Sequence, residues 1–382
     1  MNSRSSHPMT RFTLALLLLA MGCGSPPDLR EPVQSEAAPQ VATSANGVVS
    51  AAQPLAAAAG AAMLEQGGNA VDAAVAAAFT LAVVEPSMSG LGGRAQILIR
   101  LPDGTFAGVD GTTQAPDSYD PDTAPQASYG YPTVGVPGVP AALLKALSEY
   151  GSLDRATVMA PAIAAARDGF ELLPGEAARH AAAFDRIAEF EGTRAIFLKD
   201  DSTTWQAGDL FVQPDLARTL EALAADGVDA FYRGEIAERI AADVTGNGGA
   251  VTAEALAAYQ ALDSRVVTST YRGYETIGLW LPSYGAITIE ILNLLETLPL
   301  AEFDEDDWAT AVAEAIRVAY LDRPEQRTPE DAERLTSKEW AAQQAALMRV
   351  ASPAMVALDD GAGVRAAEAG VRCEVVASAT VQ

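Results

Sequence analysis

Apolar and polar positions along the chain follow a helical period in most segments, and glycine or proline separates these segments from one another. Residues 54–66 and 70–84 are predicted helices. The first starts at Pro54 and stops at Gly67-Gly68, whereas the second has Asn69 as its N-cap and ends before Pro86. The apolar run 73–84 is shorter than the about 20 residues that a bilayer span needs. We therefore expect a buried helix of a globular domain.

Shorter segments rich in β-branched residues predict strands. Residues 95–101 and 105–109 flank Pro102-Asp-Gly104 and form a predicted hairpin, and 47–51 is a predicted first strand. A second strand pair turns at Tyr271-Arg-Gly273 and covers residues 265–270 and 274–279. Further predicted helices cover residues 141–150, 161–167, 175–190, 213–226, 234–244, 252–258, 287–298 and 308–321. This pattern indicates a large α/β domain.

The first 22 residues have the features of an export signal. Two arginines precede the apolar segment 12–21, and Gly22-Cys23 follows it, which resembles a bacterial lipoprotein cleavage site. We expect Cys23 to be lipid-modified, and a signal without lipid is the alternative. Residues 23–46 are then a flexible Pro/Ser/Ala-rich tether. The protein is accordingly expected to be exported and anchored at the periplasmic face of the cell envelope by lipid alone.

Composition excludes several classes of function. The chain carries 50 Asp and Glu against 25 Lys and Arg, which argues against nucleic acid as a partner. His7 lies in the signal, so His180 is the one histidine that remains, and we expect it at the surface of a helix. Cys373 has no partner for a disulfide once Cys23 is lipidated. A Ser-His-Asp or Cys-His arrangement and a histidine-ligated metal are thus excluded, and neither a metal nor a cofactor is expected.

Eleven regions of the chain contain short glycine-, proline- or charge-bearing motifs, and their order along the sequence is informative. They are Ala52-Gln-Pro-Leu55, Gln66-Gly-Gly-Asn-Ala-Val-Asp-Ala-Ala74, Val84-Glu-Pro86, Ser89-Gly-Leu-Gly-Gly93, Val134-Gly-Val-Pro-Gly138, Pro161-Ala-Ile163, Asp168-Gly-Phe170, Phe231-Tyr-Arg-Gly-Glu-Ile-Ala237, Gly248-Gly249 before Thr252, Tyr271-Arg-Gly273 and Glu314-Ala315 running to Tyr320-Leu-Asp-Arg323. As an ordered set they resemble the γ-glutamyltranspeptidase (γ-glutamyltransferase, glutathione hydrolase) family. The resemblance covers a large-subunit domain at residues 47–341.

The resemblance implies an α/β (α+β) fold, the αββα sandwich of the N-terminal-nucleophile hydrolases. In that family the precursor cuts itself into a large and a small subunit. The new N-terminal threonine of the small subunit is the nucleophile, and its own amine serves as the base, so that no histidine is needed. A γ-glutamyl group passes from glutathione or a related amide to the threonine, then to water or an amino acid. The turn at residues 89–93 lacks the Lys-Ser/Thr of a phosphate loop, so close backbone packing is the favoured interpretation.

Two departures from the family pattern concern the substrate site. The family's Asp-x-Arg-Glu-x-Ala-Pro motif, whose arginine binds the substrate's α-carboxylate, reads Asp110-Gly-Thr-Thr-Gln-Ala-Pro116 here, with Thr112 in the arginine's place. Arg94 stands where the family usually has glycine; it is a weaker candidate for binding substrate, and a solvent-facing role is the alternative. The family's Pro/Ser/Gly-rich loop reads Leu281-Pro-Ser-Tyr-Gly-Ala286.

The end of the chain departs from the family as well. Residues 342–382 are an expected irregular tail without the Thr-Thr-His context of the nucleophile. Thr380 is near the right place, but we expect neither cleavage before it nor a strand after it. No residue of this chain is therefore assigned as catalytic, and the nucleophile is expected beyond Gln382, on a small-subunit polypeptide. A separately encoded small subunit, a truncated or frameshifted gene, and a lineage that lost the chemistry all stay open.

Three functions follow from these observations. The first is a γ-glutamyltransferase-type large subunit, inactive by itself and completed by its small subunit. The second is an acylase-like relative that does not prefer γ-glutamyl groups, which Thr112 favours. The third is a catalytically silent envelope lipoprotein.

Overall fold

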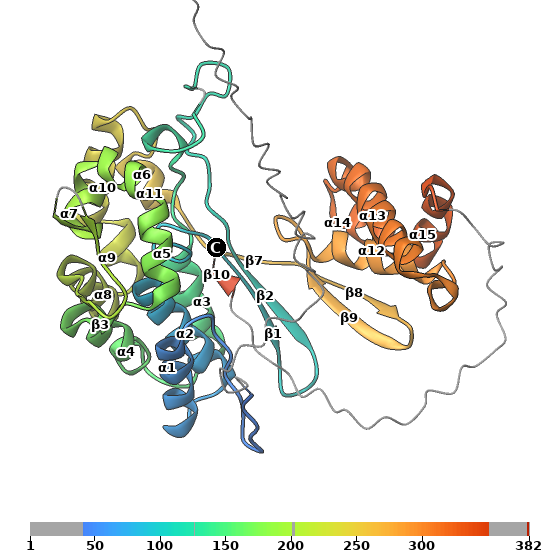
Figure 1. The fold of residues 1–382 in the computed structure, drawn as a ribbon, viewed down its shortest axis with the longest axis horizontal. Helices are drawn as coiled ribbons and strands as arrows, with labels where there is room; N and C mark the ends of the chain where they lie inside the picture. Colours follow the sequence, from blue (N-terminus) through green and yellow to red (C-terminus); the bar gives the residue numbers. More distant parts are fainter. Residues whose placement is uncertain (1–40, 126, 201–202, 351–379, 382) are drawn as a thin grey trace, which may run out of the picture. The chain divides into compact units, whose positions relative to one another are not determined.

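The computed structural model describes residues 41–125, 127–200, 203–350 and 380–381, drawn as a ribbon in Figure 1. The described residues from Ser44 onward belong to one compact unit. Cys23, the export signal and most of the predicted tether lie outside the described residues. Lipid modification and export therefore stay predictions.

Two of the predicted helices open the compact unit, α1 (Pro54–Glu65) and α2 (Ala70–Val84). Asn69 caps α2 as predicted, because its side-chain oxygen accepts hydrogen bonds from the backbone N–H groups of Val71 (2.8 Å) and Asp72 (3.2 Å). In return the Asp72 carboxylate accepts the N–H of Asn69 at 2.7 Å. α2 is buried along almost its whole length, between α1 and α4 (Arg155–Asp168). None of the helices in the described part of the chain has the length and apolarity that a bilayer span requires.

The predicted hairpin forms the centre of a four-stranded antiparallel sheet. β1 (Ala95–Arg100) and β2 (Phe106–Gly111) pair along their full length, with Ala95 opposite Gly111. β7 (Leu262–Asp263) pairs with the other edge of β2, and β10 (Thr380–Val381) pairs with β1 opposite Ala95 and Gln96. The strand order is β10-β1-β2-β7 (Figure 1).

Helices bury one face of this sheet and build the main core. α3 (Val139–Tyr150) packs on β1, β2 and α2, and α4 packs on α8 (Pro214–Asp226). Phe79, Met63, Leu143 and Met159 are among the largest fully buried side chains there. The remaining helices of this region are α9 (Val228–Tyr232), α10 (Glu235–Gly246) and α11 (Ala253–Ala258).

Residues 170–211 form a set of short elements that the sequence pattern predicted only in part. The single helix expected over 175–190 is two helices, α5 (Pro174–Ala182) and α6 (Phe184–Glu189), which break at Ala183. α7 (Glu191–Phe197) and two small sheets were missed. Their strands are β3 (Phe170–Glu171) with β6 (Leu210–Phe211), and β4 (Leu198–Asp200) with β5 (Thr203–Thr204). Strands of two or three residues are too short to show a period of two.

The predicted second hairpin supports the last group of helices. β8 (Val266–Tyr271) pairs with β9 (Tyr274–Leu279), and α12 (Gly285–Glu296) packs on both strands. α13 (Glu305–Asp322) packs on α12. α12 is also contacted by two helices that the sequence did not predict, α14 (Pro329–Leu335) and α15 (Lys338–Gln344). These helices are orange to red in Figure 1. Short 3-10 turns in the described residues are Tyr131–Thr133, Leu300–Glu302, Arg323–Glu325 and Ala345–Leu347.

The strand predicted over residues 47–51 is wrong, since these residues form neither a strand nor a bridge. Val49 packs instead against the main core beside α1. A Cβ added at Gly60 would lie 2.7 Å from the Cγ1 of Val49 and 2.8 Å from the carbonyl oxygen of Ala73. The β-branched side chain is therefore used for packing against a close helix pair and not for strand pairing.

Candidate functional site

The two hairpins border a cavity of about 520 Å³. β1 and the end of β2 supply one wall, and β9, the loop after it and α12 supply the other. The lining residues are Arg94, Gln96, Leu98, Thr112, Thr276, Ile277, Gly278, Leu279, Pro282, Ser283, Tyr284, Gly285, Thr288, Ile289 and Leu292. Both residues proposed from the sequence, Arg94 and Thr112, therefore lie on this one cavity. Their role in binding substrate stays a prediction.

A hydrogen-bond network fixes Thr112 at the polar end of the cavity. Gln96 Nε2 donates to the hydroxyl oxygen of Thr112 (2.8 Å) and also to Oδ1 of Asp110. The backbone N–H of Thr112 donates to the same Asp110 oxygen at 2.8 Å, and the hydroxyl of Tyr259 donates to the Thr112 carbonyl at 2.9 Å. Both hydrogens of the Gln96 amide are thus in use. Arg94, the other candidate on this cavity, is exposed.

Gln96 is a residue of this site that the sequence interpretation missed. It stands on β1 two positions after Arg94, and its neighbours on the strand, Ile97 to Ile99, are aliphatic. Since side chains two apart on a strand lie on the same face, a polar residue there was a signal that it faces the same site as Arg94.

Tyr259 supports the network from behind. Burial, with a smaller effect from the charge of Asp110, raises the pKa of Tyr259 above its ordinary value, so that its hydroxyl stays protonated and available as a donor. Its ring stacks on that of Tyr232, with centroids 5.3 Å apart and planes 10° apart. The hydroxyl of Tyr232 in turn donates to the carbonyl of Pro137 at 2.8 Å. The backbone at Thr112 is therefore held by Tyr259, whose ring is in turn packed against Tyr232.

Glycines let three backbone segments approach closely beside this network. The carbonyl oxygen of Gly93 accepts the N–H groups of Gly138 (2.9 Å) and Val139 (3.2 Å). A Cβ added at Gly138 would lie 1.9 Å from the carbonyl oxygen of Gly111, which no side chain could tolerate. Close backbone packing was the favoured interpretation of the turn at residues 89–93, and at Gly93 it holds.

The opposite wall of the cavity depends on Tyr284. Its ring stacks on Tyr320 of α13, with centroids 6.3 Å apart, and the guanidinium of Arg323 lies 5.1 Å from its centroid. Behind it, a Cβ at Gly285 would lie 2.3 Å from the carbonyl oxygen of Leu279, so the start of α12 fits against β9 only with glycine. The wall is therefore built by residues of β9, α12 and α13 together.

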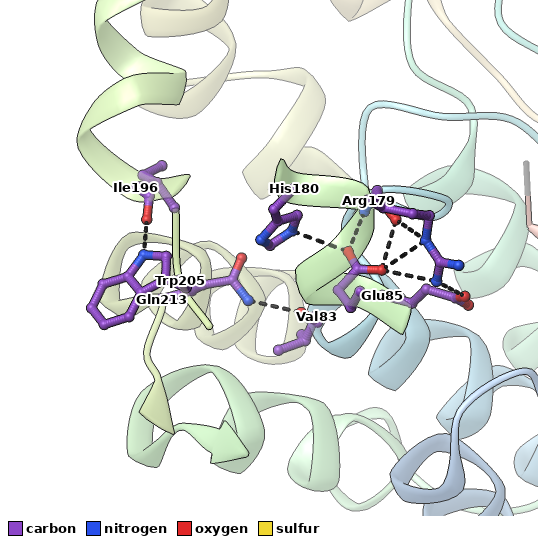
Figure 2. Close-up of polar contacts among 9 residues, drawn as sticks. Val83, Glu85, Arg179, His180, Ile196, Trp205 and Gln213 are labelled. Carbon is purple, nitrogen blue, oxygen red and sulfur yellow. Dashed lines mark hydrogen bonds and ion pairs between the residues drawn. The ribbon is translucent and has the colours of Figure 1, made fainter. Parts of the chain in front are cut away.

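The prediction that His180 lies at the surface is wrong, because its side chain is 3% exposed. It lies on α5 against the rings of Phe197 and Phe211, with centroids 5.2 and 5.9 Å away. Its Nε2 is 3.2 Å from Oε1 of Glu176. Neither ring nitrogen of His180, however, has a partner among the described residues that meets the geometry of a hydrogen bond. Figure 2 shows this buried histidine beside Arg179 of the same helix.

Glu176 lies between His180 and Ser87, which excludes a Ser-His-Glu triad at this place. The Ser87 hydroxyl donates to Oε2 of Glu176 at 2.7 Å and its N–H donates to Oε1 at 2.8 Å. A triad needs the histidine next to the hydroxyl, whereas here the carboxylate stands in between. Arg179 completes the cluster by pairing with Glu176 (3.0 Å) and with Glu85 (2.8 Å) (Figure 2). The cluster therefore joins α5 to the end of α2.

Thr380 lies in a short strand that the sequence did not predict. It belongs to β10 and pairs with Gln96 of β1, so the backbone at Thr380 lies beside a residue of the cavity. Of the described residues along this edge of β1, Ala95 and Gln96 have a strand partner, whereas positions 97–100 have none. This edge of the sheet can thus accept further strand pairing.

Comparisons with known proteins agree on one family. The chain matches the family described as Gamma-glutamyltranspeptidase over residues 56–364. The glutathione hydrolase proenzyme of Escherichia coli (strain K12) is 36% identical over 295 residues, which cover 73% of this chain and 50% of that protein. The acylase ACY 1 proenzyme of Pseudomonas sp. (strain SE83) is 34% identical over 300 residues, covering 74% of this chain and 54% of that protein.

A solved structure extends the agreement to the fold. The γ-glutamyltranspeptidase of Helicobacter pylori superimposes with a TM-score of 0.77 at 31% identity, over 85% of this chain and 100% of that chain. A cephalosporin acylase from Bacillus halodurans has the same fold, with a TM-score of 0.71 and 30% identity over 77% of this chain and 58% of that chain. The α/β fold class of the N-terminal-nucleophile hydrolases is thus confirmed. The chain spans about half the length of the curated relatives it matches.

Proposed function

Because the chain belongs to the γ-glutamyltranspeptidase family, we propose that it is the large-subunit part of a γ-glutamyltransferase or glutathione hydrolase. In this proposal a small-subunit part supplies a threonine nucleophile, and the γ-glutamyl group of glutathione or a related amide is transferred to water or to an amino acid. The observation that carries the proposal is the match to the family over residues 56–364, together with alignments in which the chain spans about half of the Escherichia coli relative.

The residues that line the cavity support a site in which this chain binds the substrate and the small-subunit part supplies the nucleophile. Its lining contains the hydroxyl-bearing residues Thr112, Thr276, Ser283, Tyr284 and Thr288, but among the described residues no histidine, cysteine, lysine or carboxylate lines it. A hydroxyl nucleophile needs a neighbouring base, so these groups can bind and position a substrate without attacking it. Beyond Gln96 this edge of β1 pairs with none of the described residues, which supports a further strand from the small-subunit part at this side of the cavity.

The test is turnover of a γ-glutamyl anilide by this chain combined with the small-subunit part of the Escherichia coli relative. We expect turnover from the combination and none from either part alone. A combination that forms a stable complex without turnover would contradict the proposal. The control is a small-subunit part whose N-terminal threonine is replaced by alanine, which should bind this chain equally well and give no turnover.

An acylase with a different acyl group is the second candidate function. Thr112 favours it, because the hydroxyl of this residue is already bonded to Gln96 and cannot replace the two parallel bonds that a guanidinium gives to a carboxylate. A relative described as an acylase is 34% identical. Turnover of an acyl anilide without an α-carboxylate, faster than that of the γ-glutamyl anilide, would decide for this candidate.

Placement at the cell envelope completes the proposal. The apolar segment 12–21 followed by Gly22-Cys23 supports export and lipid attachment. We expect mass spectrometry of the mature protein to find Cys23 as an acylated first residue. A soluble protein that starts elsewhere and has no acyl mass would contradict this part.

A further inference from the structure

Two buried carboxyl groups share one hydrogen-bond donor between α12, α13 and α15. Glu290 of α12 is 0% exposed and Asp322 at the end of α13 is 9% exposed. The indole Nε1–H of Trp340 on α15 donates to Glu290 Oε1 at 3.1 Å and to Asp322 Oδ2 at 2.8 Å. The second oxygen of Glu290, Oε2, is buried and has no donor among the described residues. Two ionised carboxylates would have one N–H between them.

A proton shared by the two carboxyl groups resolves this conflict. Burial raises the pKa of Glu290 to about 9, and both the hydrogen bond to Asp322 and the negative charge of Asp322 add to this effect. The hydrogen bond from Trp340 and the positive charge of Arg334 lower the pKa, but by less. At neutral pH Glu290 is therefore protonated and can donate to Asp322.

The charged groups around the pair are otherwise engaged. Arg334 of α14 stacks on the Trp340 ring with its Cζ 4.4 Å from the centroid, and it pairs with Glu325 and Asp331 at 3.3 Å each. Lys338 of α15 bonds to Asn293 (2.7 Å) and pairs with Glu296, both on α12. No lysine or arginine in the described part of the chain forms an ion pair with Glu290 or Asp322. Removing the proton would leave two buried negative charges without a cation.

The pair is connected to the candidate site by two short paths. Glu290 is on the same helix as Thr288, Ile289 and Leu292, which line the cavity. Asp322 directly precedes Arg323, whose guanidinium lies over the ring of Tyr284, and Tyr284 lines the same cavity. A movement of α12 against the end of α13 would therefore displace a cavity wall.

We propose that Glu290 and Asp322 act as a one-proton latch, which holds α12, α13 and α15 together and fixes the wall of the cavity at Tyr284. When the proton leaves to solvent, the two carboxylates repel each other, and the helices separate. The latch is a property of the fold and does not depend on which reaction the cavity serves.

The sign of the pH dependence follows from linkage. The closed state binds the proton more tightly than an open state, in which Glu290 is solvated and has a pKa near its reference value of 4.5. The closed state is thus fully favoured below that value and loses stability as pH rises toward about 9, where the loss levels off. Each pH unit within this window changes the closed-to-open ratio by about tenfold.

The substitution that tests the latch is Glu290→Gln, because a glutamine amide reproduces the protonated acid. Its N–H can donate to Asp322, its oxygen can accept from Trp340, and it does not ionise. In the full chain labelled with ¹⁵N-tryptophan, the Trp340 indole signal should titrate with a midpoint near pH 9 in the unmodified protein. In Glu290→Gln the signal should resemble the neutral-pH signal of the unmodified protein and should not titrate. Glu339→Gln, an exposed position on the same helix as Trp340, is the matched control and should titrate like the unmodified protein.

A second measurement follows the opening itself. At each pH, the hydrogen-exchange rate of the α12 amides in the unmodified protein is divided by the rate in Glu290→Gln, so that the intrinsic pH dependence cancels. Between pH 6 and pH 8 this ratio should rise by up to about a hundredfold. In Asp322→Asn the Trp340 titration should move to lower pH, because one neighbouring charge is gone. A flat ratio, or a Trp340 titration that persists unchanged in Glu290→Gln, would overturn the proposal.

Discussion

Replacing Glu176 by glutamine tests how strongly α5 is fastened to the end of α2. The carboxylate is 3% exposed and accepts both the N–H and the hydroxyl of Ser87, while Arg179 donates to it from the same helix. Glutamine has the same shape, but one of its two terminal groups is an NH₂ that cannot accept a hydrogen bond. The change therefore removes the charge and misplaces at least one of the Ser87 donors.

The magnitude follows from the pKa of Glu176. Burial would raise this pKa, but the contacts with His180, Ser87 and Arg179 outweigh burial and lower the pKa from 4.5 to about 2. A depressed pKa means that the folded state favours the charged carboxylate, so its contribution is present above about pH 4.5 and is lost as pH falls toward 2. A shift of about 2.5 units corresponds to about 3 kcal/mol. Glu176→Gln should lower the free energy of unfolding by about this amount at pH 7.

Equilibrium urea unfolding of both proteins between pH 7 and pH 2.5 measures the effect. The difference in the free energy of unfolding between them should be largest at pH 7 and should shrink below pH 4.5, because the Glu176 carboxylate of the unfolded chain becomes protonated there while that of the folded protein stays ionised down to about pH 2. Glu171→Gln, at an exposed position on β3, is the control and should change little at any pH. A Glu176→Gln difference that stays constant from pH 7 to pH 2.5 would refute the ionic explanation and indicate a loss of shape complementarity alone.

Three further predictions concern the cavity. In the complete enzyme, Thr112→Arg should lower the KM for a γ-glutamyl anilide by about tenfold, because the new guanidinium can pair with Asp110 and a substrate carboxylate; an unchanged KM would direct attention to Arg94. Tyr259→Phe should cost about 1 kcal/mol in thermal or urea unfolding, since it removes the hydroxyl that donates to the Thr112 carbonyl, and a neutral result would contradict the supporting role. The 382-residue chain by itself should show no turnover of γ-glutamyl or acyl anilides, and turnover that a substitution within the chain abolishes would identify an overlooked nucleophile.

Local signals in the sequence predicted most of the regular elements. The bounds of α2 were correct to the residue because Asn69 and Asp72 form a capping box at one end and Glu85-Pro86 stops the helix at the other. The hairpin of β1 and β2 was also predicted, because Pro102-Asp-Gly104 separates two apolar segments. Both signals are contained in a few neighbouring residues.

The errors arose where a distant partner decides the outcome. Residues 47–51 have the composition of a strand, but they pair with no strand in the described part of the chain, and Val49 packs against the main core. His180 has polar and alanine neighbours in the sequence, and its burial comes from Phe197 and Phe211, which follow 17 and 31 positions later. The pairing of Glu290 with Asp322 was not predicted, because Asp322 was noted only as part of the motif Tyr320-Leu-Asp-Arg323 and Glu290 belongs to none of the motifs.

The candidate site shows the same limit in its chemistry. The motif comparison identified Thr112 as a position where a cation had been exchanged for a hydroxyl, and this suggested a lost binding group. The structure shows that the place is not vacant, because the Gln96 amide reaches across from β1 and bonds both Thr112 and Asp110. An arginine placed at 112 must therefore displace this amide before it can pair with Asp110. The gain from Thr112→Arg should be larger when Gln96 is changed to leucine as well, and equal gains in the single and double variants would mean that the amide does not compete for Asp110.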